Sequence, residues 1–355
     1  DRRQRQMCIR DRMAPTGRAA KRLAISSGRD ADTIHKALEA SVRETGRTYF
    51  ERNEANPLEE DLIIVDEASM LDISLFYHLL CALKDGARLI LVGDIDQLPP
   101  VGAGEPLKDL MSWGYVPIVR LKHIFRQEEG SGIVENAALI RKGEMCVPDE
   151  AGEFRIVYAA DDEDAYRIVM DLCRELNYGN EENKMLLQVL SPMYRGVCGV
   201  DHLNESLQEM IHGEKVPDGM KFFPGDKVMQ TRNDYEKGIY NGDVGTVWTA
   251  TPQKVFVHYF DKEVVYEGEE RFDLRLAYAV TVHKSQGSEY ETVIFILRPS
   301  QHNMLQRNLL YTGVTRARKN TILVTAPDAL RRALAIQHTG NRYSLFLPFL
   351  NHEAL

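Results

Sequence analysis

The stretch LIIVDEASMLDISLFYHLLCALKDGARLILVGDIDQLPPVGAG, residues 62–104, decides the fold. Residues 62–65 and 89–92 are short apolar runs on either side of a segment with helical period, which predicts a strand, a helix and a second, parallel strand. Polar residues and a glycine follow the two runs, namely Asp66, Glu67, Gly93, Asp94 and Gln97. Ligands of open parallel sheets bind beyond the carboxyl ends of the strands. Because Mg²⁺ prefers oxygen ligands and a second carboxylate can orient a water, this stretch predicts a magnesium-nucleotide site.

Length and composition limit the class of protein. The 355 residues exceed the roughly 250–300 that one core usually serves, so we expect two or more domains. The net charge of −9 excludes an overall basic coat but leaves room for local basic patches. No apolar run approaches the ~20 residues of a membrane span, so we expect no membrane association. The five cysteines form no C-x-x-C pair, which argues against a disulfide scaffold and favours a cytoplasmic location.

The first twelve residues, DRRQRQMCIRDR, are polar and basic and have no strand or helix period. They are either a basic arm that binds nucleic acid or a tail that is non-native or the edge of a fragment. We favour the tail, and we exclude these residues from the predicted fold.

The next stretch, residues 13–29, carries four basic residues and no acidic one. Thr16 precedes a run of strong helix formers and is a plausible N-cap. Two interpretations stay open: a basic helix that contacts a nucleic-acid backbone, or a solvated helix face. Further along, the apolar loop 98–104 predicts a surface that contacts a partner, and the glycine-bounded residues 143–152 predict a linker.

In the second half of the chain, the sequence predicts an α/β segment, then a segment of short β-strands, and then an α/β segment again. A strand is predicted at 185–190, and short strands at 227–230, 244–248 and 254–259 with an Asn-Gly turn predict a small inserted barrel. A strand at 276–282 then leads to His283 and Lys284, which are either a core histidine and an exposed lysine or contacts to phosphate. Residues 309–319 predict a helix with a basic end, where Arg316 is either a partner of the helix dipole or catalytic. Arg126 is either paired on the surface or suited to gripping phosphate.

Seven stretches in one order closely resemble the RecD-like group of superfamily 1B DNA helicases: APTGRAAKRL, TIHKAL, VDEASM, LVGDIDQLPPVGAG, FRQ, AYAVTVHKSQGSEY and YTGVTRARK. The resemblance implies an α/β fold of two RecA-like parallel-sheet domains, the first one truncated, with a small Src-homology-3-like β-barrel inserted in the second. The expected domains are 13–142 for the first, 143–184 for a linker and connecting helix, 185–223 with 274–345 for the second, and 224–273 for the barrel.

The resemblance also implies roles for individual residues. Asp66 would hold Mg²⁺, Glu67 would activate the attacking water, Gln97 would sense the γ-phosphate, and Arg126 and Arg316 would act as arginine fingers. The residues that would border ATP are Gly93, Asp94, Gln286, Gly287 and Glu289. The residues that would line the DNA track are Pro15, Thr16, Arg18, Thr33, His35, Tyr194, Arg195, Thr281, His283 and Lys284.

The implied activity is ATP-dependent 5′–3′ movement of a monomer on single-stranded DNA, with unwinding at duplex junctions. One feature of the family is absent: no G-x-x-x-x-G-K-[ST] loop occurs in the 355 residues. We therefore expect an amino-terminally truncated helicase that hydrolyses little ATP by itself. The alternative is a non-catalytic module that binds single-stranded nucleic acid with the helicase fold.

Overall fold

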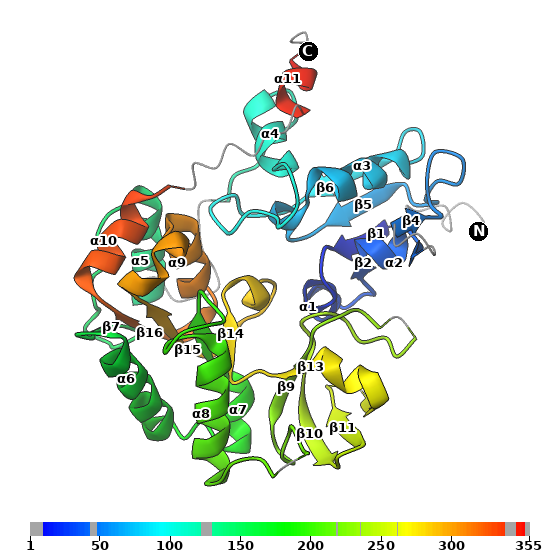
Figure 1. The fold of residues 1–355 in the computed structure, drawn as a ribbon. Helices are drawn as coiled ribbons and strands as arrows, with labels where there is room; N and C mark the ends of the chain where they lie inside the picture. Colours follow the sequence, from blue (N-terminus) through cyan, green and yellow to red (C-terminus); the bar gives the residue numbers. More distant parts are fainter. Residues whose placement is uncertain are drawn as a thin grey trace. The chain divides into compact units, whose positions relative to one another are not determined.

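The computed structural model describes residues 10–42, 48–121, 130–217, 219–234, 236–260, 262–337 and 346–351. Contacts divide the chain into two compact units (Figure 1). Unit 1 comprises Asp1–Leu121 with Gly340–Leu355, and unit 2 comprises Lys122–Thr339. Each unit has a parallel sheet and an apolar core of its own.

Unit 1 is built on a parallel sheet with the strand order β2-β1-β5-β6. The strands are β1 (Arg10–Ala14), β2 (Asp32–Thr33), β5 (Leu62–Val65) and β6 (Arg88–Leu91). The two apolar runs of the opening stretch thus form neighbouring parallel strands, as predicted, with Val65 opposite Leu91. Because all four strands run the same way, their carboxyl ends lie along one edge of the sheet.

The amino-terminal residues require a correction. Residues 10–12, which we excluded from the fold, form the first part of β1, and Arg10 and Arg12 pair with Leu62 and Ile64 of β5. Interior strands of parallel sheets are usually apolar, so a charged start gives no strand signal in the sequence. Burial raises the pKa of Asp11 because its charged form loses hydration.

Helices and a short hairpin surround this sheet. They are α1 (Gly17–Ser27), α2 (Ile34–Ala37), β3 (Ala40–Val42), β4 (Thr48–Phe50), η2 (Ala68–Met70), α3 (Ile73–Cys81), α4 (Pro106–Trp113) and α11 (Phe346–Leu350). Asp72 caps α3 by accepting a hydrogen bond from Leu75 N at 2.8 Å. The ring of Phe346 lies 5.9 Å from that of Phe76, which attaches α11 to unit 1.

Unit 2 contains a second parallel sheet with the order β14-β8-β15-β16-β7. The strands are β7 (Phe154–Tyr158), β8 (Leu187–Ser191), β14 (Ala279–Thr281), β15 (Tyr290–Leu297) and β16 (Ala317–Thr325). The helix expected at 309–319 ends earlier, since α9 (Arg307–Val314) stops before β16 begins. Arg318 and Lys319 consequently lie on a strand.

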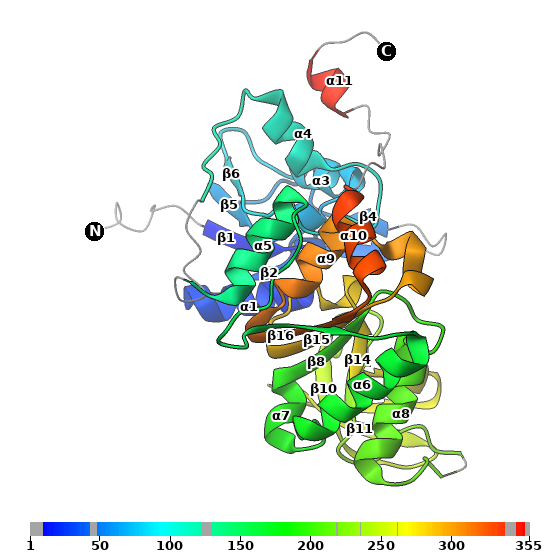
Figure 2. The ribbon, with the colours of Figure 1, turned by 90° about the vertical axis from the view of Figure 1, so that its left-hand side faces the viewer.

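The boundary between the units lies earlier than we expected. We assigned 122–142 to the first domain and 143–184 to a linker, but α5 (Gly132–Lys142) packs against α9 in unit 2 (Figure 2). Strand β7 pairs with β16, and α6 (Asp162–Glu175) contacts β16. The side chain of Asn136 in α5 exchanges two 2.8 Å hydrogen bonds with the backbone of Val147. Residues 143–152 are therefore held in unit 2 by hydrogen bonds and do not form a free linker between the units.

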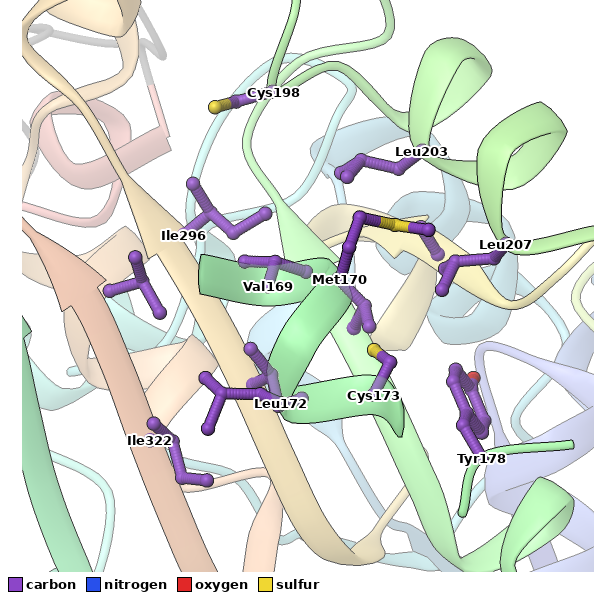
Figure 3. Packing of buried hydrophobic residues seen from close by; sticks show 14 of the residues in the cluster. Val169, Met170, Leu172, Cys173, Tyr178, Cys198, Leu203, Leu207, Ile296 and Ile322 are labelled. Carbon is purple, nitrogen blue, oxygen red and sulfur yellow. The ribbon is translucent and has the colours of Figure 1, made fainter. Parts of the chain in front are cut away.

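Helices cover both faces of the second sheet. Val169 and Leu172 of α6 and Leu203 and Leu207 of α8 (Val200–His212) pack on the face that presents Ile294 and Ile296 of β15 (Figure 3). The intervening Phe295 lies against Gly313 of α9. Alternate residues of one strand thus contact helices on opposite faces, which explains why residues 293–297 of β15 are all apolar. The remaining helices of unit 2 are α7 (Glu181–Leu186) and α10 (Pro327–Ala335).

The inserted β region is an antiparallel sheet with the order β12-β11-β10-β9-β13. Its strands are β9 (Lys227–Gln230), β10 (Val244–Ala250), β11 (Lys254–His258), β12 (Glu263–Glu267) and β13 (Leu274–Leu276). The three predicted strands are confirmed, and β12 and β13 are additional. The single strand expected at 276–282 is instead divided, because the chain leaves this sheet after β13 and enters the parallel sheet as β14.

Candidate active site and nucleic-acid interface

Asp66 and Glu67 stand at the carboxyl end of β5. Asp66 N donates to Met13 O at 2.9 Å, and an Asp66 carboxylate oxygen accepts from Glu67 N at 2.9 Å. Glu67 has φ 52° and ψ 36°, a left-handed conformation that is uncommon for a residue with a side chain and costs on the order of 1 kcal/mol. Glu67 is also 8% exposed. Strain and burial at an acidic residue are typical of a functional position.

The end of β6 is joined directly to this turn. Ala68 N donates to Val92 O at 2.8 Å, and a Cβ on Gly93 would lie 2.8 Å from Ser69 N. Only glycine therefore permits this approach. Asp94 accepts from Asp96 N at 3.0 Å, and Asp94 O accepts from Gln97 N at 3.3 Å, so Gln97 is positioned by the same turn. The structure thus brings Asp66, Glu67, Gly93, Asp94 and Gln97 together.

These residues fit Mg²⁺ and a nucleotide in part. The carboxylates offer hard oxygen ligands, and the buried Ser69 Oγ has no hydrogen-bond partner within the described ranges, as expected for a group that awaits a ligand or water. No cluster of three or more metal-binding side chains occurs among the described residues. A magnesium ion here would therefore take most of its ligands from phosphate and water. Because the sequence lacks the lysine loop, these residues do not provide a phosphate cradle.

A second cluster lies in unit 2 around Arg316. Its side chain is 2% exposed and donates from Nη1 to Ser288 O and from Nε to Thr312 O, both at 3.2 Å. Gln286 is buried, Gly287 has φ 73°, and Glu289 lies 4.0 Å from Arg318. The predicted nucleotide-bordering residues Gln286, Gly287 and Glu289 are thus adjacent to Arg316 in space. Its role as an arginine finger stays a prediction, and Arg126 lies outside the described residues.

The predicted DNA residues of unit 1 meet at the ends of β1 and β2. Ala14 pairs with Thr33, which places the turn at Pro15 and Thr16 beside the turn that leads to His35. Thr16 and Thr33 cap the helices that follow, accepting from Ala19 N at 3.3 Å and Lys36 N at 3.1 Å. Arg18 is half-buried in the first turn of α1. Burial lowers the pKa of His35, because the charged ring loses hydration.

In unit 2, Thr281 and Lys284 form one turn. Thr281 is buried, and its Oγ1 accepts from Lys284 N at 3.2 Å, so this hydroxyl shapes the turn. Lys284 Nζ donates to Asn241 at 2.6 Å. Burial lowers the pKa of His283 and of Lys284. Tyr194 and Arg195 line a groove together with Lys284, and the groove is also lined by residues of the 3-10 helix η3 (Gly268–Asp273) and by Arg275 of β13.

Three family models match the chain in order. The model of an AAA domain matches residues 7–155, that of the SH3 domain of ATP-dependent RecD-like DNA helicases matches 203–259, and that of the UvrD-like helicase C-terminal domain matches 276–324. The antiparallel sheet therefore corresponds to the inserted barrel that we expected.

The fold is shared with solved helicase structures. The Bacteroides Pif1 helicase in complex with ADP-AlF3 and ssDNA aligns with a TM-score of 0.55 at 20% identity, over 97% of this chain and 86% of that one. Bacteroides Pif1 bound to ssDNA aligns with a TM-score of 0.55 at 19% identity, over 90% and 83%. The class is therefore that of α/β proteins with two RecA-like parallel sheets and an inserted SH3-like sheet.

Sequence similarity gives named relatives. The ATP-dependent RecD2 DNA helicase of Deinococcus radiodurans is 38% identical over 94% of this chain, and the RecBCD enzyme subunit RecD of Mycolicibacterium smegmatis is 32% identical over 94%. The chain is thus similar to RecD-type DNA helicases along almost its whole length. It spans 45% of the length of the first relative and 65% of the second. No helix in the described ranges is long and apolar enough to cross a membrane.

Proposed function

We propose that these residues are the carboxyl-terminal part of an ATP-dependent helicase that moves 5′ to 3′ on single-stranded DNA and opens duplex junctions. The observation that carries this proposal is the strained, buried Glu67 beside Asp66, held against Gly93 at the end of the next strand. A protein that only binds DNA has no need of this arrangement. The relatives named as ATP-dependent DNA helicases, and the Pif1 structures with ADP-AlF3 and ssDNA, support it.

Each residue of the acidic edge has a role in this proposal. Asp66 holds the magnesium ion, and Glu67 orients the attacking water and accepts its proton. Gln97 contacts the γ-phosphate and relays its presence to the loop that follows. When bound, the nucleotide would supply the phosphoryl group and the magnesium ion would neutralise part of its charge. Arg126 and Arg316 stabilise the charge that develops during transfer, an effect worth ~10³-fold or more in related enzymes.

The DNA strand lies on the polar turns at the carboxyl edges of the two sheets. The Thr16 and Arg18 turn in unit 1 and the His283 and Lys284 turn in unit 2 offer donors to phosphate and sugar. Such contacts hold a strand without reading its sequence, as a motor requires. The DNA contacts assigned to Pro15, Thr33, His35 and Thr281 are part of the same proposal.

The phosphate-binding loop is the missing part of the site. We infer that the 355 residues alone bind ATP weakly, because backbone amides and a lysine that hold the β- and γ-phosphates have no counterpart in the sequence. The active protein would carry that loop upstream of β1. We further propose that the active helicase is monomeric and cytoplasmic.

The absent loop also favours a second function, a module that binds single-stranded DNA without hydrolysing ATP. The first of two measurements tests both candidates, and the second separates them. A fluorescent oligothymidine should bind the 355-residue chain, with weaker binding for Arg18→Gln; a chain that binds no oligonucleotide at low salt contradicts both functions. Extending the reading frame upstream should reveal G-x-x-x-x-G-K-[ST] and confer DNA-stimulated ATP hydrolysis. A start codon near Met13 would leave only the binding module.

A further inference from the structure

The carboxyl-terminal helix α11 consists of five apolar residues, with the sequence FLPFL. A helix of this length is unstable alone in water, so contacts with the rest of the protein must hold it. Four of its residues are half-buried, and the fifth, Phe349, is 67% exposed. One face of α11 is therefore covered, and the face that carries Phe349 is open.

The covered face lies on unit 1, beside α4 (Figure 1). The ring of Phe346 meets that of Phe76 in α3 edge to face, with 5.9 Å between the centroids and 76° between the planes. Phe346 packs against the same apolar core cluster as Leu107 and Leu110 of α4. Because Phe76 is 2% exposed, Phe346 contacts the closed core of the unit and not an isolated surface ring. Phe346 is thus the residue that anchors α11.

The helices under α11 also carry the acidic edge. A Cβ on Gly93 would lie 2.8 Å from a methyl group of Leu107, which places α4 against the turn after β6. Ile73 N, at the start of α3, donates to Ala103 O at 2.8 Å. Both helices are therefore packed against the turns and the loop that follow β5 and β6.

The position of α11 in the sequence gives these contacts a further consequence. Unit 2, Lys122–Thr339, is inserted within the sequence of unit 1, which resumes at Gly340. A unit joined by one linker can turn in any direction, whereas two separate connections restrict it to rotation about the line that joins them, as in a hinge. The contacts of α11 provide the second of these connections.

The same chain is the favoured source of the docked segment. A segment that is covalently joined to its site by a short linker docks at an effective concentration on the order of 1 mM. A second copy of the chain reaches such a concentration only in very concentrated solution. One aromatic anchor is therefore enough to keep α11 on its own unit 1.

We propose that residues 346–350 are a strap, which Phe346 anchors on α3 and α4. The strap closes a second connection between the units and makes their relative motion that of a hinge. It also joins the carboxyl-terminal end of unit 2 to the helices behind the acidic edge. The proposal goes beyond the proposed function, because it assigns no residue to DNA or ATP.

Phe346→Ala tests the anchor in the 355-residue chain. Asn351 N donates to Leu347 O at 3.0 Å, so its exchange with solvent reports whether α11 is formed. Hydrogen exchange read by mass spectrometry should show about tenfold or greater loss of protection in the peptide that contains this amide. Small-angle X-ray scattering should show a larger radius of gyration, because one of the two connections is released.

Phe349→Ala is the matched control, since it removes the same ring from the open face of the same helix. It should leave the protection and the radius of gyration unchanged. Fluorescence of Trp113, the last residue of α4, should show that unit 1 of the Phe346→Ala variant still unfolds in a cooperative transition, measured with Trp248→Phe to remove the other tryptophan. Phe346→Leu keeps an apolar anchor and should retain most of the protection.

Three results would overturn the strap. The first is equal protection and equal radius of gyration for Phe346→Ala and the unaltered chain. The second is loss of the Trp113 transition in Phe346→Ala, which would make Phe346 a core residue of unit 1 and not the anchor of a separate segment. The third is a dimeric scattering mass that becomes monomeric in Phe346→Ala, since α11 would then dock on a second copy. Binding of oligothymidine is measured separately, so the proposed function stands if the strap fails.

Discussion

The strained backbone of Glu67 indicates that its side chain serves the function of the protein and not the stability of the fold. Its left-handed backbone is a conformation that glycine adopts freely and glutamate does not. If the side chain serves catalysis, Glu67→Gly should raise the free energy of unfolding of unit 1 by about 0.5–1 kcal/mol. Urea unfolding measures this change. A loss of more than about 1 kcal/mol would instead show that the carboxylate stabilises the fold.

Two half-buried histidines allow a prediction about pH. Burial lowers the pKa of His35 and of His283 from the ordinary value of 6.5, because desolvation disfavours the charged ring. In the pH window just below 6.5 the unfolded chain therefore binds more protons than the folded chain, and the free energy of unfolding falls as pH is lowered. NMR titration of the imidazole Cε1 protons should give values below 6.5 for both residues. A value above 6.5 for either would contradict the burial.

Secondary-structure elements show how far the sequence predicts this fold. Apolar runs without charge predicted β5, β6 and the core of β8, although only β8 of the three is buried along its whole length. Strand β1 was missed because Arg10, Asp11 and Arg12 carry no such signal, and its place depends on pairing with β5. The boundary at residue 142 was misplaced because glycines mark a turn but do not show which unit a helix packs on. The contact of α5 with α9 is tertiary and has no local signal.

One part of the candidate site was likewise predicted from the sequence, and another part was not. The acidic edge was predicted, since strand ends of a parallel sheet must converge. The contribution of Phe272 and Arg275 to the groove was not predicted. Both are about eighty residues from Tyr194 along the chain, and only the fold makes them neighbours. No short motif identifies such a pair.

Helix α9 gives a prediction about packing between elements. A Cβ at Gly313 would lie 2.5 Å from a ring carbon of Phe295 in β15. Gly313→Ala should therefore destabilise unit 2 by about 1–3 kcal/mol, although alanine is the better helix former. The double variant Gly313→Ala with Phe295→Leu should recover part of this loss in urea unfolding. A more stable single variant would show that the helix and strand are not packed this closely.

At the scale of the whole molecule, the inserted sheet and the parallel sheet of unit 2 act as one body. Lys227 connects them by donating from Nζ to Lys184 O and Leu187 O, and Tyr278 OH donates to the fully buried Asp226 at 2.8 Å. Lys227→Met should cost about 3 kcal/mol or more, because the carbonyls stay buried without that donor. Trp248 fluorescence should report a single unfolding transition for both sheets.

The control for this substitution is Lys254→Met, which removes an exposed lysine from the same sheet. Its ion pair with Glu267 is on the surface, so its loss should change the free energy of unfolding by about 1 kcal/mol or less. Equal effects of the two substitutions, or separate transitions for the two sheets, would contradict the rigid connection.

Hydrolysis of ATP by the chain extended upstream through a phosphate-binding loop tests the central claim most directly. Single-stranded DNA should stimulate the extended protein. Glu67→Gln should lower that DNA-stimulated turnover by ~10²–10⁴-fold, the usual contribution of a general base, and leave oligonucleotide affinity unchanged. Glu54→Gln, which alters an exposed carboxylate of unit 1, should hydrolyse ATP normally. Turnover that survives Glu67→Gln unchanged would contradict the assignment of the acidic edge as the site of ATP hydrolysis.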